Sequence, residues 1–191
     1  MSLRVSTEPV LEPITLAEAK THLRVNHTDD DTYITTLIKV ARRSIENKIQ
    51  RALINRTYTA SFDTWPANGR VITLEFPRLQ SVTSIKYYDT SEVQQTLSSS
   101  YYRLDSESEP ARIILYDDYT WPSLWVNGNA IEIIYVAGYG ASAANVPDDI
   151  KQAILMAIGH WYNQREEIST FEIFNIPQAS SYLAMPYRCW I

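Results

Sequence analysis

The stretch that decides the fold is Val146-Pro147-Asp148-Asp149-Ile150, which continues to Asn163-Gln164-Arg165-Glu166. Proline in a first helical turn costs nothing, because the N–H group that it lacks would have no partner inside the helix. Asp148 and Asp149 place negative charge beside the positive end of the helix dipole. The apolar residues that follow recur every three or four positions and share one face: Ile150, Ile154, Ala157, Ile158 and Trp161. A helix this apolar should be buried, so the sequence predicts a partner element for it.

That partner is predicted near the beginning of the chain. Thr15 and Glu18 have the spacing of a capping box, which predicts a short helix from Leu16 to about Leu23. A second helix should follow the acidic run 28–31. These carboxylates fit a helix N-terminus better than a calcium loop, whose Gly and Glu positions are missing. The apolar residues of this second helix again share one face: Ile34, Leu37, Ile38, Ala41, Ile45 and Ile49. We therefore expect it to pack against the helix after Pro147.

Between these helices the hydrophobic pattern changes to a period of two, which is typical of half-buried strands. Tyr58, Ala60 and Phe62 alternate with polar residues. Further strands are predicted over residues 71–76, 82–88, 92–97, 111–116 and 130–136. Their spacing indicates an antiparallel sheet or a small barrel. Two similar tetrapeptides, 63–66 and 119–122, are interpreted as strand exits, each with a buried Trp and a Pro that ends strand pairing.

The predicted fold class is α+β. It has a small helical core, made of the N-terminal helices and the long C-terminal helix, with an inserted antiparallel β domain and an extended C-terminal arm. The predicted segments are 1–55 for the N-terminal arm and helices, 56–142 for the β domain, 143–168 for the core helix and 169–191 for the C-terminal arm. The C-terminal arm is too apolar for a solvated linker. It should dock either on its own domain or on another subunit.

The composition limits the classes of protein to which this chain could belong. The 191 residues are 45% hydrophobic and 20% charged, which is ordinary for a globular protein. The net charge of −5 argues against a protein whose main role is to grip nucleic acid. Cys189 is the single cysteine, so no disulfide within the chain is possible. No apolar run approaches the roughly 20 residues that span a bilayer, and the N-terminus lacks a signal-peptide pattern.

The sequence predicts no catalytic, cofactor or metal site, and hence no enzyme. His22, His27 and His160 are far apart and have no recognised ligand spacing. We interpret His160 as a hydrogen-bonded core or boundary residue. Cys189 has no base nearby in the sequence and should be a packed, inert thiol. The nucleophile, zinc-protease and phosphate-loop motifs are missing from the sequence.

Basic residues of the second predicted helix, among them Arg42 and Arg43, together with Arg51 and Arg56 after it, leave two interpretations open. They could form a solvated face interleaved with Glu46. They could instead form a positive strip that contacts an acidic neighbour or phosphate groups.

In their order along the chain, several stretches resemble the head–tail connector (adaptor) proteins of long-tailed bacteriophages and related prophage-derived particles. The matching stretches are Ile14-Thr15-Leu16-Ala17-Glu18-Ala19-Lys20, Leu23-Arg24-Val25, Asp30-Asp31, Ala41-Arg42-Arg43-Ser44-Ile45-Glu46, residues 74–89, Ala137-Gly138-Tyr139-Gly140, residues 146–153, His160-Trp161-Tyr162, Arg165-Glu166 and Pro186-Tyr187-Arg188. One departure is Thr90-Ser91-Glu92, where the family often has a glycine in the turn.

The resemblance implies a structural protein of the virion that is assembled in the cytoplasm of the bacterial host. It implies a ring, typically of twelve copies, beneath the portal protein at the head–tail interface. A tail-proximal connector or tail terminator protein would attach below, double-stranded DNA would pass through without specific contact, and no membrane would be involved. We expect contacts with the portal or a neighbouring subunit from the C-terminal arm, through Tyr182, Pro186, Tyr187, Arg188 and Trp190.

Two other functions stay open at the level of sequence. An aromatic-rich β module could recognise carbohydrate or protein on a particle or cell surface, and it would expose Trp65, Trp121 or Trp125 on one open face. The arginines at 42 and 43 could alternatively bind nucleic acid, with an affinity that falls steeply with salt.

Overall fold

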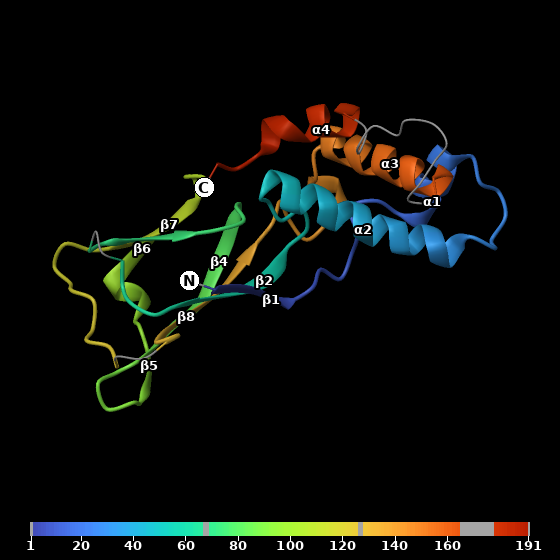
Figure 1. Cartoon of the computed structure of the whole chain (residues 1–191). Helices are drawn as coiled ribbons and strands as arrows, with labels where there is room; N and C mark the ends of the chain where they lie inside the picture. Colours follow the sequence, from blue (N-terminus) through green and yellow to red (C-terminus); the bar gives the residue numbers. More distant parts are fainter. Residues whose placement is uncertain (1, 67–68, 126–127, 165–177, 191) are drawn as a thin grey trace. The chain divides into compact units, whose positions relative to one another are not determined.

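The computed structural model describes residues 2–66, 69–125, 128–164 and 178–190, and it divides the chain into two compact units. The helical unit comprises Val10–Ile54 and Gly140–Arg188. The sheet unit comprises Met1–Pro9, Asn55–Tyr139 and Cys189–Ile191. Helices and antiparallel sheets are both present (Figure 1), which confirms the predicted α+β class.

The helical unit is built around the predicted pair of helices, which pack together (Figure 1). Its elements are α1 (Leu16–Leu23), α2 (Asp31–Ile49), the 3₁₀ turn η2 (Ala143–Asn145), α3 (Asp148–Asn163), α4 (Gln178–Ala184) and the 3₁₀ turn η3 (Met185–Tyr187). The apolar face predicted for α2 is buried, as are Ile150, Ile154, Ala157 and Ile158 of α3. None of the helices in the described ranges is long and apolar enough to cross a membrane.

The capping box predicted for α1 is confirmed. The Glu18 N–H donates to Thr15 Oγ1 at 3.2 Å, and the Thr15 N–H donates to Glu18 Oε2 at 2.7 Å. Hydrogen bonds from the Thr15 hydroxyl and then from its N–H lower the pKa of Glu18, because they favour the charged carboxylate.

The sequence predicts that the acidic residues before α2 stabilise the N-terminus of this helix. The structure shows additional contacts for Asp30 and Asp31. Asp30 is the N-cap residue, but its side chain makes no capping hydrogen bond. Its carboxylate instead accepts from the Tyr162 hydroxyl on α3. Asp31 accepts from Lys20 Nζ of α1 at 2.6 Å and still lies in the first turn, where the helix dipole favours it. These two carboxylates therefore fasten the start of α2 to both neighbouring helices.

The C-terminal part of the chain is more helical than expected. α3 begins one residue after Pro147, which is its N-cap, and ends at Asn163; residues 165–167, also predicted to be helical, lie outside the described residues. Of the arm predicted over 169–191, the described part contains α4 and η3. The α4 sequence has no Gly, Pro or β-branched residue, and it buries Ser180 and Ala184.

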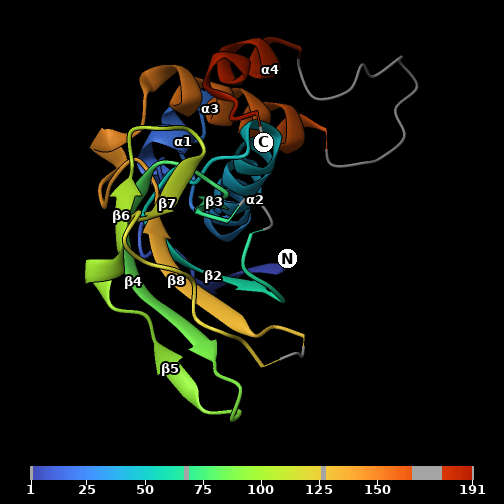
Figure 2. The same cartoon turned by 90° about the vertical axis from the view of Figure 1, so that its left-hand side faces the viewer.

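The sheet unit contains two antiparallel sheets. The five-stranded sheet has the order β1-β2-β8-β4-β5, with β1 (Ser2–Thr7), β2 (Arg56–Phe62), β8 (Ile131–Ala137), β4 (Leu79–Tyr88) and β5 (Gln94–Thr96). Figure 2 shows β2, β8 and β4 side by side, with β8 between the other two. The three-stranded sheet has the order β3-β7-β6, with β3 (Val71–Leu74), β7 (Ala111–Leu115) and β6 (Tyr102–Asp105).

Aromatic rings stack in the core of the sheet unit. The Tyr58 ring lies between those of Phe76 and Tyr135, with centroid distances of 5.3 and 5.4 Å. The Tyr135 hydroxyl donates to the Glu75 carbonyl at 2.8 Å, so the buried polar end is satisfied. Burial raises the pKa of Tyr135, because an apolar surrounding disfavours its anion.

The sequence did not predict β1 or β6. Residues 1–13 were expected to be an extended arm of the helical core, yet β1 pairs antiparallel with β2, with Leu3 opposite Ala60. Almost every residue of β1 is exposed, so no buried-exposed alternation marks it as a strand.

Candidate interaction surfaces

The residues predicted to contact a portal or a neighbouring subunit lie in the described segment 178–190. Tyr182 is 73% exposed and Trp190 is 71% exposed. Pro186 is also exposed, whereas Tyr187 and Arg188 are half-buried. Two aromatic side chains that could anchor a contact are therefore accessible.

Hydrogen bonds at Ser181 and Tyr187 fasten the α4–η3 part of this segment to the rest of the helical unit. The buried Arg51 donates through Nε to the Tyr187 carbonyl, and Lys48 Nζ donates to Ser181 Oγ. The Tyr187 hydroxyl donates to Asp149 Oδ2 at the start of α3, at 3.0 Å. Tyr187 thus has a structural role that sequence reasoning missed, because its partners are 136 and 38 residues away and no local pattern joins them.

Arg42, Arg51 and Arg56 are buried, so they do not belong to a positive strip on the surface. Arg42 is 2% exposed; its Nε donates to Glu12 Oε2 at 2.7 Å and its Nη1 to Glu46 Oε2 at 2.9 Å. Glu46 is 0% exposed and also accepts from the Leu53 N–H at 2.9 Å. The solvated-face interpretation is therefore wrong for these two residues. Arg43 is exposed.

Three tryptophans, Trp65, Trp121 and Trp125, are half-buried and turn toward neighbouring groups. The rings of Trp65 and Trp121 stack with centroids 4.4 Å apart, and Trp65 Nε1 donates to the Pro122 carbonyl at 2.8 Å. The Trp125 ring meets the Tyr88 ring edge-on at 6.3 Å. The two similar tetrapeptides therefore pack on each other, and these rings form no open platform for a sugar.

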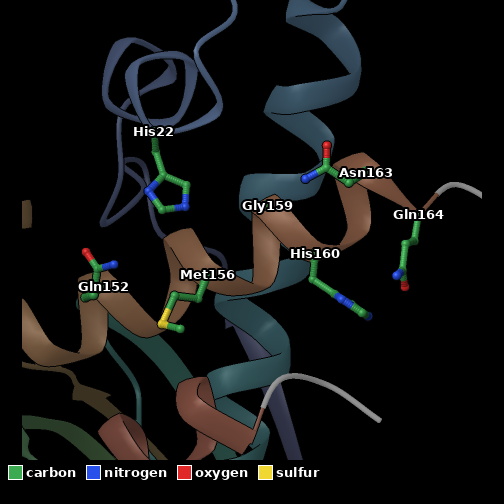
Figure 3. A pocket seen from close by; sticks show the side chains of 7 residues that line it. All are labelled: His22, Gln152, Met156, Gly159, His160, Asn163 and Gln164. Atoms are coloured by element: carbon green, nitrogen blue, oxygen red, sulfur yellow. The ribbon is translucent and has the colours of Figure 1, made fainter. Parts of the chain in front are cut away.

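A shallow depression of about 490 Å³ lies between α1 and α3 (Figure 3). His22 extends from α1 toward Gly159, where an added Cβ would lie 3.4 Å from the imidazole Nε2. His160 points away from His22 (Figure 3), so the two imidazoles do not converge on one point. In the ranges that the structure covers, no group of three or more His, Cys, Asp or Glu residues could hold a metal ion. Cys189 is buried, as expected of a packed thiol.

The strongest functional features of the described residues are thus exposed aromatic side chains on firmly attached segments. Such side chains are typical of protein–protein interfaces. The chain belongs to the head completion protein family, whose model matches residues 12–172.

Solved structures of gene transfer agent particles contain chains with the same fold. A chain in the neck of an empty gene transfer agent (GTA) particle, resolved with C6 symmetry, is 23% identical with a TM-score of 0.84. A chain in the virion of the native GTA particle is 24% identical with a TM-score of 0.82. A chain in the native GTA neck, resolved with C12 symmetry, is 24% identical with a TM-score of 0.81. Each similarity covers 100% of this chain and 97% of the other. A comparison with curated proteins found no match.

Proposed function

We propose that this chain is a structural head–tail connector, which forms a ring beneath the portal vertex and joins the capsid to the tail. The observation that carries the proposal is the head completion family match over residues 12–172. The related fold in a GTA neck with C12 symmetry supports a ring of twelve copies. The chain acts at the head–tail interface of the virion, after assembly in the cytoplasm of the bacterial host.

Its partners are the portal protein above, other copies in the ring, and a tail-proximal connector or tail terminator protein below. It catalyses no reaction and needs no cofactor. Double-stranded DNA passes through the ring, and the net charge of −5 suits a channel that must not hold DNA. The burial of Arg42 supports this view, because it removes one of the two arginines of the alternative interpretation in which this chain binds phosphate groups.

Attachment to the portal involves the C-terminal segment, with Tyr182 and Trp190 as the anchors and Pro186 and Arg188 beside them. A deletion of residues 180–191 would also remove the buried Ala184 and Cys189, so single substitutions give a clearer test. Tyr182→Ser and Trp190→Ser should leave the stability of the monomer unchanged, since both side chains are exposed.

The assay is complementation of particles that lack this chain, with electron microscopy to count heads that carry tails. The two variants should yield mainly tailless heads, whereas Val10→Ser, at another exposed apolar position, should complement fully. Normal tailing by both variants would refute their role as portal anchors. Normal tailing without the chain would refute the connector function itself.

A further inference from the structure

The sheet unit exposes a cluster of tyrosines beside acidic side chains. The Tyr101 and Tyr119 rings stack with centroids 4.3 Å apart, and the Tyr116 N–H donates to the Tyr101 carbonyl at 3.0 Å. Asp117 and Asp118 lie between the two later tyrosines, and all five residues are exposed. We call Tyr101 and residues 116–119 the tyrosine turn. Its rings are ordered in advance, which lowers the entropic cost of binding a partner.

The tyrosine turn carries negative charge that is balanced only in part. Arg70 Nη1 lies 3.2 Å from Asp117 Oδ1 and donates to the Tyr116 carbonyl at 2.9 Å. No ion pair or hydrogen bond joins Asp118 to any residue in the described part of the chain. The turn therefore offers aromatic faces and one available carboxylate, which is the chemistry that a cationic side chain recognises.

The solvent side of α2 offers the complementary chemistry. Lys39, Val40 and Arg43 are exposed, and their spacings of one, three and four residues place them together on the helix surface. We call these three residues the basic strip. Within the described ranges Lys39 makes no ion pair or hydrogen bond. Val40 is 46% exposed and adds apolar area beside Arg43.

We propose that the basic strip of one copy docks on the tyrosine turn of the next copy, with the Lys39 ammonium against the tyrosine faces and Asp118. This inference rests on the proposed ring. A ring requires heterologous contacts, in which two different patches of the same chain meet. These two surfaces have opposite charge, and each also offers exposed apolar area. Charge complementarity of this kind fixes register and selects partners.

A charge swap tests the contact. The purified full-length chain would be studied by sedimentation velocity as wild type, Lys39→Glu, Asp118→Lys and the double variant. Each single reversal should weaken self-association about tenfold at low salt, because repulsion replaces attraction. The double variant should recover most of the association. Wild-type association should weaken as salt rises and screens the exposed charges.

Two further variants separate this contact from a general effect of charge. Glu107→Lys makes the same change in net charge as Asp118→Lys on an exposed position of the sheet unit, and it should leave association unchanged. Tyr119→Ser should weaken association without altering net charge.

The inference is overturned if neither single reversal weakens association, if the double variant does not recover it, or if the wild-type chain is monomeric at every concentration. These results leave the connector function standing, because that function fails only if heads acquire tails without this chain.

Discussion

Replacement of Arg42 by methionine should destabilise the helical unit by about 3–5 kcal/mol. The Glu46 carboxylate would then lose its 2.9 Å bond from the guanidinium while it stays buried, and removal of one partner from a buried ion pair carries a penalty of this size. Glu12 would lose a 2.7 Å bond as well. Since a folded domain has only about 5–15 kcal/mol of stability, the loss is a large share of the total.

Two companion variants separate charge burial from a general loss of arginine. Arg43→Met changes the neighbouring, exposed arginine of α2 and should cost within about 0.5 kcal/mol. The double variant Arg42→Met/Glu46→Gln should be at least about 1 kcal/mol more stable than Arg42→Met alone, because the buried carboxylate that Arg42 pairs with is then replaced by a neutral amide. The new amide oxygen can still accept the Leu53 N–H, which Glu46 now accepts at 2.9 Å.

The measurement is unfolding in urea, monitored by far-ultraviolet circular dichroism, which reports mainly on the helices. The helical signal is the appropriate probe because the two units can unfold in separate transitions, and a single free energy would then be undefined. If Arg42→Met costs no more than Arg43→Met, the reasoning about the buried ion pair is refuted. If the double variant is no more stable than Arg42→Met, the cost comes from lost packing instead.

Three smaller predictions concern single sites. Arg112, and then Ser108, lower the pKa of Asp105 from 3.8 to about 2, so its contribution to stability is present above pH 3.8 and is lost as the pH falls to about 2. In acid titrations followed by circular dichroism, Asp105→Asn should therefore lose less stability over this window than wild type. Gly140→Ala should lower the melting temperature, at a cost of about 1–3 kcal/mol, because the new Cβ would collide with the Asn145 side chain. Trp65→Ala should cost about 2–3 kcal/mol in chemical denaturation, since the stacked partner indole would lose its neighbour; an unchanged midpoint would contradict this.

The sequence predicts best those elements whose hydrophobic period or capping motif lies entirely within their own residues. Every apolar residue predicted for the buried face of α2 is buried. A helix with one solvent-exposed face must repeat its apolar residues every three to four positions, so the pattern is visible in the sequence. β8 alternates buried and half-buried residues along its length, because its side chains project alternately to the two faces of the sheet. The Thr15–Glu18 capping box is equally local.

What the sequence could not predict depends on distant partners. Arg42 and Glu46 look like surface residues of an amphipathic helix, but they are buried and contact groups outside α2 such as Glu12 and Leu53. β1 needs β2 to become a strand, and its register partners lie fifty or more positions along the chain. The predicted segment boundaries after residues 55, 142 and 168 stay predictions, which limited proteolysis can examine.

The attachment of the C-terminal segment explains how residues that touch no partner can still contribute to assembly. Ordering a rotamer-rich side chain on binding costs about 0.5–1.5 kcal/mol, and ordering backbone costs more. Arg51 and Asp149 hold Tyr187 in place within the monomer, so the segment loses this conformational entropy on folding and not on binding. Under the proposed function, the segment that bears Tyr182 would meet the portal already ordered. Selection on portal binding would then act on Arg51 and Asp149 as well as on the exposed anchors.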